Sequence, residues 1–142
     1  MNTEALGEAI LAAIPRNVVT RVHEGQIPEG SEPKLPWVIA SLRLPQIRER
    51  SLAATPIVTS AHLQLTVAAG THTGVLQIVD DLMGIDGHRL SVDGWECGPI
   101  LVHNVRRPEV DRSLTITGTA AHVVFTVLEA RLTVSSRPVV GA

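Results

Sequence analysis

The chain has 142 residues, 44% of them apolar and 18% charged, so it is long enough for one folded domain and is not disordered. A net charge of −2 without a basic stripe argues against electrostatic nucleic-acid binding, and two Trp and one Phe offer little base stacking. The single Cys97 excludes an internal disulfide, and we expect neither a secretory signal nor the ~20-residue apolar run of a membrane span.

The N-terminal half of the chain predicts one helix, two strands and two long connections. Apolar side chains at four-residue spacing predict an amphipathic helix over 3–14. Short β-branched runs predict strands over 17–24 and 37–44. The connections over 25–36 and 45–58 are long, and long loops in compact domains usually carry function or are disordered.

The following segments alternate between strand and helix patterns. Strict apolar–polar alternation predicts a strand with one buried face over 60–69, and a helical stripe follows over 73–83. Asp93–Gly94 suits the two-residue turn of a hairpin within 88–98. A further strand is expected over 100–107, before Pro108.

The longest strand-like run, 118–134, is apolar on both faces, so we expect it to be covered on both sides, and Phe125 is a candidate core side chain. Most consecutive strands are joined as hairpins. The sequence therefore predicts an α+β fold, a mainly antiparallel mixed sheet with two α-helices packed on one face. We expect a single domain over 1–134 and a loose C-terminal tail over 135–142.

The segment "AAGTHTG", 68–74, lies between a strand and a helix, as many phosphate-binding loops do. A Walker-type loop needs Lys to reach the phosphates, and the only Lys of the chain is Lys34 in a distant loop. The dinucleotide spacing of glycines is also absent. The favoured interpretation is a turn in which Gly70 ends the strand and Thr71 or Thr73 caps the helix.

Other patterns of catalytic or metal-binding residues are also weak, so we expect no catalytic, cofactor or metal site. The six histidines are scattered, although His62 and His122 could meet across a sheet. Asp80 and Asp81 diverge on a helix, which favours a solvated or subunit-contacting face over a catalytic pair. Cys97 has no pattern of partners that marks a nucleophile.

Two clusters of mixed charge are the candidate interaction residues. Such clusters are usually solvated loops, but they also determine how one subunit recognises the next in an assembly. The candidates for a subunit or tube interface are Arg43, Arg48, Glu49, Arg50, Arg106, Arg107, Asp111 and Arg112.

The order of segments along nearly the whole chain resembles the tail terminator, or tail completion, proteins of long-tailed bacteriophages. The resemblance is carried by "TEALGEAILAAI", "LPWVIASLRL", "SAHLQLTVAAGTHTGVLQIVDDLMGI", "HRLSVDGW" and "RRPEVDRSLTITGTAAHVVFTVLEA". The charged, aspartate-containing segment before a long apolar strand is especially similar to the family. None of these segments is a catalytic signature, and no family site motif transfers residue by residue.

The resemblance implies a structural protein without a cofactor, made in the host cytoplasm and located in the virion at the tail–neck region. It implies a homo-hexameric ring that binds the last ring of tail tube protein and ends tube polymerisation. The ring would present a docking surface to the head-completion or connector protein. DNA would pass through its lumen without sequence-specific binding, and the loop over 45–58 is a candidate lumen-facing or inter-subunit arm.

Three alternatives remain open at this point. The closest is a head-completion or connector protein of the same neck. A small enzyme or ligand-binding α+β domain would require a pocket with convergent polar groups. A tube-like component of a contractile secretion system would form stacked rings without a phage tail.

Overall fold

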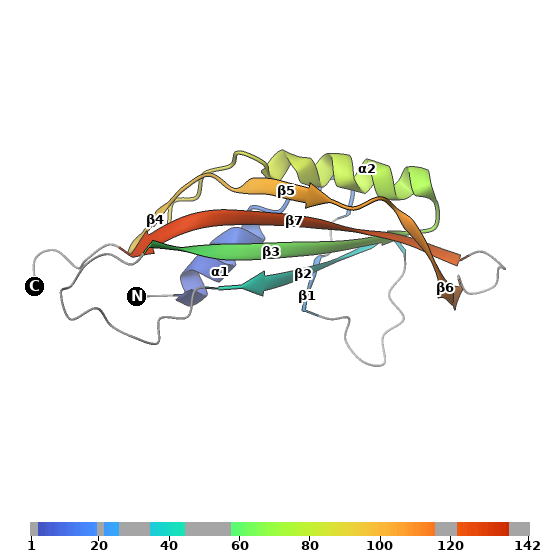
Figure 1. The fold of residues 1–142 in the computed structure, drawn as a ribbon, viewed down its shortest axis with the longest axis horizontal. Coiled ribbons are helices and arrows are strands. Elements are labelled where there is room, and N and C mark those ends of the chain that lie inside the picture. The colour runs from blue at the N-terminus through green and yellow to red at the C-terminus, as the bar shows by residue number, and fades with distance from the viewer. Residues whose placement is uncertain (1–2, 20–21, 26–34, 45–57, 116–121, 137–142) are drawn as a thin grey trace, which may run out of the picture.

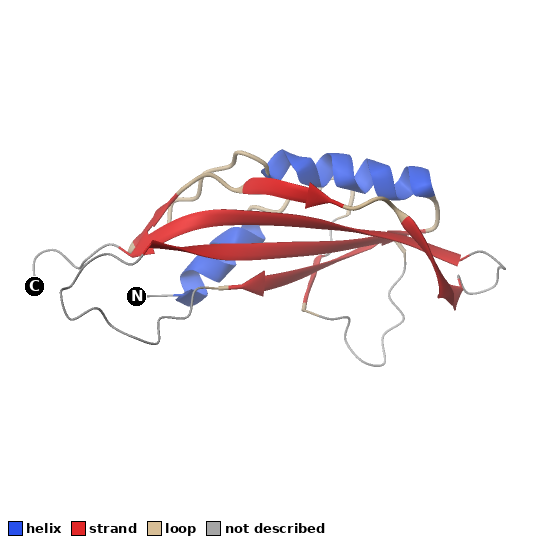
Figure 2. Cartoon of the chain, viewed as in Figure 1, coloured by secondary structure: helices blue, strands red, loops and turns tan. Residues whose placement is uncertain are grey.

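The structure is a computed structural model that describes residues 3–19, 22–25, 35–44, 58–115 and 122–136. Strands dominate these residues, and two α-helices accompany them (Figures 1 and 2). The predicted mixture of helix and strand, with a mixed sheet and two helices, is confirmed. No helix in the described ranges has the length and apolar character needed to cross a membrane.

The two helices form where the apolar spacing predicts them. Helix α1 spans Thr3–Ala12, two residues shorter than predicted, and Pro15 follows soon after it. Helix α2 spans His72–Leu82 and continues into a short 3₁₀ turn, η1, over Met83–Ile85. Each helix therefore presents one apolar stripe, and the buried residues of α2 are Val75, Ile78 and Leu82.

Within the described residues, seven strands form one mixed sheet. Their bounds are β1 Val22–Glu24, β2 Trp37–Arg43, β3 Val58–Ala69, β4 Trp95–Cys97, β5 Leu101–Val105, β6 Glu109–Thr115 and β7 His122–Ser136. The order is β1-β2-β3-β7, and β4, β5 and β6 pair in succession along the other edge of β7. The β1–β2 pair is parallel, and the other pairs are antiparallel.

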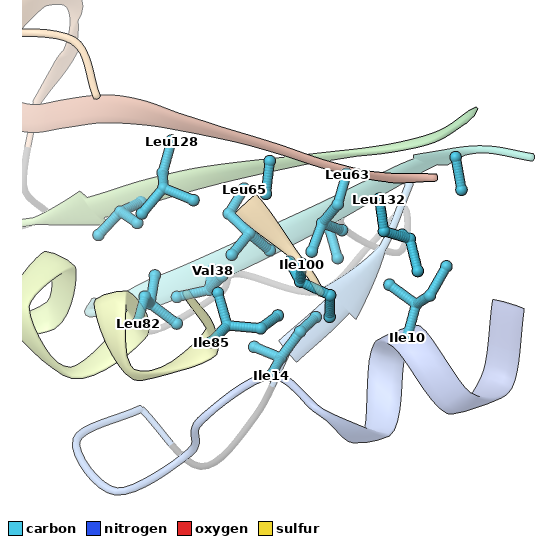
Figure 3. Packing of buried hydrophobic residues seen from close by; sticks show 14 of the residues in the cluster. Ile10, Ile14, Val38, Leu63, Leu65, Leu82, Ile85, Ile100, Leu128 and Leu132 are labelled. Carbon is cyan, nitrogen blue, oxygen red and sulfur yellow. The ribbon is translucent and has the colours of Figure 1, made fainter. Parts of the chain in front are cut away.

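The main core is one cluster of buried side chains from α1, α2, η1 and the strands. Its side chains come from alternate positions of the long strands, such as Leu63 and Leu65 of β3 and Leu128 and Leu132 of β7. Figure 3 shows Ile10, Ile14, Leu82 and Ile85 pointing at these strand residues. We call the face that carries these strand residues the core face of the sheet.

Several strands differ from the sequence prediction. Of the strand predicted over 17–24, the structure shows 22–24, while residues 17 and 18 are held by a side chain of α2 instead of by a strand; 20 and 21 lie outside the described residues. The segment over 109–115, predicted as a charged cluster, pairs with β7 as β6. Strand β7 runs to Ser136 and so includes two residues of the predicted tail; 137–142 lie outside the described residues.

The expected hairpin at Asp93–Gly94 is present as a very short turn. Gly94 has a φ of 85°, a conformation that glycine adopts without strain, and Val92 and Trp95 form a single bridge across the turn. Beyond the turn, β4 extends its pairing along β7, and Trp95 at its start also makes the single bridge to Val92. Strand β7 offers β4 three successive pairing positions, whereas the segment before the turn offers a single bridge.

Candidate functional site

The face of the sheet opposite the core, which we call the outer face, is the candidate functional surface. In β2 the residues Val38 and Ala40 are buried in the core, so the alternating positions Trp37, Ile39, Ser41 and Arg43 point to the outer face. The pairing registers of β2, β3 and β7 align these residues into rows that run across the sheet.

One half of the outer face is apolar. A first row is formed by Trp37, Ala68 and Phe125, and a second by Ile39, Thr66 and Val127. The exposed fractions of Ala68 and Val127 are only 0% and 6%, yet neither residue belongs to the main core cluster. This half therefore forms a small second apolar cluster, which we call the apolar patch, of Trp37, Ile39, Ala68, Val123, Phe125 and Val127.

The other half of the outer face is polar. Its two rows are Ser41, Gln64 and Glu129, and then Arg43, His62 and Arg131. Here the outer face is hollowed over a volume of about 360 Å³, and the polar side chains that line the hollow are Ser41, Arg43, His62, Gln64, His103 and Glu129. The sheet thus changes from apolar to cationic along its strands.

Glu129 is the acidic residue of the hollow, and both of its carboxylate oxygens have partners. The Asn104 side-chain amide donates to Oε2 at 3.2 Å, and the Arg106 guanidinium lies 3.6 Å from Oε1. The Arg106 side chain is 61% exposed, so this ion pair is screened by solvent and contributes little stability. Its effect is to offset the negative charge of Glu129.

The edge formed by β5 and β6 exposes apolar side chains among polar ones. Leu101, Val105 and Val110 on these strands are between 41% and 47% exposed. Near the start of β5, the carboxylate of Asp86 accepts a hydrogen bond of 2.9 Å from the Val102 backbone N–H, which satisfies one donor of the edge. An apolar edge strand is a surface on which another chain can dock.

The structure brings only part of the predicted interface residues to these surfaces. Arg43 lies in the cationic row of the outer face, and Arg106 lies beside Glu129. Arg107 is exposed between β5 and β6, and Asp111 in β6 pairs with Val123 next to the apolar patch. Arg112 belongs to β6, without a described side chain, and Arg48, Glu49 and Arg50 lie outside the described residues, as does most of the 45–58 loop.

The turn "AAGTHTG" is a helix start in this structure. The Thr71 hydroxyl accepts a hydrogen bond of 3.0 Å from the Gly74 backbone N–H, so the prediction that Thr71 or Thr73 caps α2 is confirmed for Thr71. Strand β3 ends at Ala69, just before Gly70, as predicted.

Asp81 has a structural role that the sequence does not predict. Its carboxylate accepts hydrogen bonds from the Asn17 side chain at 2.8 Å and from the backbone N–H groups of Asn17 and Val18 at 3.1 and 3.2 Å. The Asn17 side-chain bond, helped by the two backbone bonds and opposed by desolvation, lowers the pKa of Asp81. Asp81 therefore ties α2 to the segment after α1, whereas the sequence favours a solvated or subunit-contacting face.

His62 and His122 do not meet across the sheet as the sequence allows. His62 in β3 pairs with Arg43 and Arg131, whereas His122 is at the far end of β7, where it pairs with Thr115. Among the residues that the structure describes, no group of three or more His, Cys, Asp or Glu side chains could hold a metal ion. Cys97 is buried in the core.

Comparison with known proteins supplies no relative that could identify this surface. No protein-family model matches the sequence, and no curated protein matches it either.

Proposed function

We propose that this chain is a structural protein of a phage tail, a terminator that assembles as a six-membered ring on the end of the tail tube. In this role it stops polymerisation of the tube protein and presents a surface to the head-completion or connector protein. The order of segments in the sequence supports the proposal, as does the division of the sheet into a helix-covered face and a second face available for assembly.

The observation that carries the proposal is the position of the aromatic side chains. The chain has only two Trp and one Phe, and of these Trp37 and Phe125 stand in one row of the outer face, away from the main core. Both are only partly buried. Aromatic anchors in an apolar centre with a charged rim are typical of protein–protein interfaces, and Arg106, Arg107 and Asp111 supply such a rim.

A closed ring requires two different surfaces on each subunit, because each copy must contact its neighbours head to tail. The partly buried members of the apolar patch, Trp37, Ile39 and Phe125, form one such surface. The second is the edge of β5 and β6, where Leu101, Val105 and Val110 are exposed. In our proposal both helices cover the core face, and the patch of one subunit packs on this edge of the next.

The test of the proposal is native mass spectrometry of the purified chain, alone and mixed with tail tubes of its own phage. We expect six copies, either free or captured on tube ends, and tubes that no longer elongate. A chain that ignores tubes but binds the portal side of the head would be a connector protein instead. A monomer that binds neither would overturn both assignments.

Phe125→Ala should prevent ring formation while leaving the subunit folded. The side chain is half-buried on the outer face, so its loss removes an anchor of the proposed contact and costs the isolated subunit only about 1 kcal/mol. Copy number by native mass spectrometry and helix content by circular dichroism measure the two effects. Leu76→Ala, which truncates an exposed apolar residue of α2 outside both surfaces, is the control and should form normal rings.

If the Phe125→Ala protein assembled like the wild type, the apolar patch would not be a contact between subunits. Equal loss of rings in both variants would mean that exposed apolar area in general, and not this patch, controls assembly.

A further inference from the structure

We propose that the hollow at the polar half of the outer face is a binding site for a phosphate group. This inference goes beyond the terminator role and does not rest on it, because it depends on the side chains of a single subunit. Three features carry it: a row in which two arginines flank a histidine, an acidic neighbour that is already paired, and a cavity of the size of a small ligand.

The first feature is the alignment of Arg43, His62 and Arg131. Arg43 pairs directly with His62, and His62 pairs directly with Arg131, so the three residues stand side by side on β2, β3 and β7. Neighbouring strands lie about 4.8 Å apart, and the three side chains therefore start within roughly 10 Å of one another. All three are exposed, and the alternation of the strands directs them to the outer face. Arg43 and His62 line the hollow, and Arg131 stands beside its wall as the next residue of the row.

The second feature is the local charge. Among the described residues, Glu129 is the carboxylate that lines the hollow, and it is bound to Arg106 and Asn104. Within the same ranges, neither Arg43 nor Arg131 has a carboxylate partner in a salt bridge. Two arginines of like charge in one row repel each other, and a bound anion would relieve this repulsion.

The third feature is the set of groups that surround the hollow. Ser41 and Gln64 add neutral hydroxyl and amide donors, and His62 and His103 add imidazole N–H groups. The volume of about 360 Å³ lies within the range of small-molecule sites, so a phosphate with an attached group would fit.

The chemistry of these donors favours phosphate over other anions. The guanidinium group offers paired N–H donors whose geometry matches the oxygens of a phosphate. A phosphate monoester carries a charge of about −1.5 to −2 at neutral pH, so it can neutralise both Arg43 in the lining and Arg131 beside it, whereas a carboxylate would neutralise only one.

The experiment is isothermal titration of the full-length chain with inorganic phosphate at constant ionic strength, with added sodium chloride as the blank. We expect saturable binding to the wild type and an affinity at least tenfold lower in Arg43→Gln and in Arg131→Gln. Arg89→Gln removes another exposed arginine, which does not line the hollow, and should bind like the wild type. Circular dichroism of each variant verifies that the fold is retained.

A second titration, with a short single-stranded oligonucleotide, separates the two sources of the phosphate group. Saturable binding of inorganic phosphate assigns the hollow to a free phosphate or a phosphorylated small molecule. Binding of the oligonucleotide alone, lost in Arg43→Gln and Arg131→Gln, assigns it to a nucleic-acid backbone. The proposal would be overturned if neither ligand bound, or if the Arg43→Gln/Arg131→Gln double variant bound as tightly as the wild type. Either result would hold whether or not the chain forms a hexameric ring.

Discussion

Asp81 shows how one carboxylate links two parts of the chain that are far apart in sequence. It receives three hydrogen bonds from Asn17 and Val18, which precede the first strand, and so fixes the path of the chain between α1 and β1 against α2. Hydrogen bonds to a charged acceptor are stronger than neutral ones, so these three bonds stabilise the ionised carboxylate more than the protonated form.

The lowered pKa of Asp81 predicts a loss of stability in acid. Because the folded-state pKa lies below the ordinary value of 3.8, the contribution of Asp81 is fully present above that value and is lost as the pH falls through the folded-state pKa. Asp81→Asn should lower the free energy of unfolding by about 1 kcal/mol at pH 7 and should flatten its dependence on pH in this window.

Urea unfolding between pH 7 and pH 3 measures this effect. Asp80→Asn changes the adjacent, exposed carboxylate of the same helix and should leave the pH dependence like that of the wild type. Identical profiles for Asp81→Asn and the wild type would show that the three hydrogen bonds do not couple folding to protonation.

At the scale of the element, the start of α2 depends on one hydroxyl. The first backbone N–H groups of a helix have no partners within it, and Thr71 satisfies that of Gly74. Gly74 itself is closely packed, since a Cβ atom there would lie 3.1 Å from the Thr71 hydroxyl and 3.3 Å from the Cβ of Ala69. The cap and the glycine therefore form one compact turn.

Thr71→Ala should lower the free energy of unfolding by about 1 kcal/mol, because it leaves the Gly74 N–H without its acceptor. Thr73→Ala, two residues further into the same helix, removes the same atoms without touching the cap and should cost less. The measurement is the Tm of each variant by thermal unfolding. Equal shifts in Tm would mean that the Thr71 hydroxyl does not stabilise the helix.

At the scale of the whole molecule, the two faces of the sheet differ in burial. Truncating nearby residues of β7 to Ala should therefore lower the free energy of unfolding by very different amounts. Leu128 is fully buried in the main core, whereas Phe125 is half-buried on the outer face. Leu128→Ala should therefore lower the free energy of unfolding by about 2–5 kcal/mol, more than Phe125→Ala despite the larger ring. Urea unfolding at concentrations where the chain is monomeric gives both values.

A larger loss in Phe125→Ala than in Leu128→Ala would place Phe125 in the core, as the sequence predicts. The sequence makes that prediction because both faces of the 118–134 run are apolar. The structure instead places Phe125 on the face opposite the main cluster.

Patterns within single segments of the sequence were sufficient to predict most helices and strands. They predicted few of the residues of the candidate site. The alternation over 60–69 predicts β3, and the apolar stripe over 73–83 predicts α2, because both signals arise within a single element. Strand β6 was missed, since the residues of 109–115 lack an apolar run and become a strand only by pairing with β7. The row of Arg43, His62 and Arg131 could not be predicted, because its members lie on three separate strands.

The sequence by itself determined the positions of both helices and of the long strands, and which residues are able to form a core. Each of these follows from side-chain volume, polarity and backbone preference within one segment. Only the tertiary structure decided which residues face each other. Strand register aligns distant residues and assigns them to a face, and so it separates the apolar patch from the cationic hollow and joins Asp81 to Asn17.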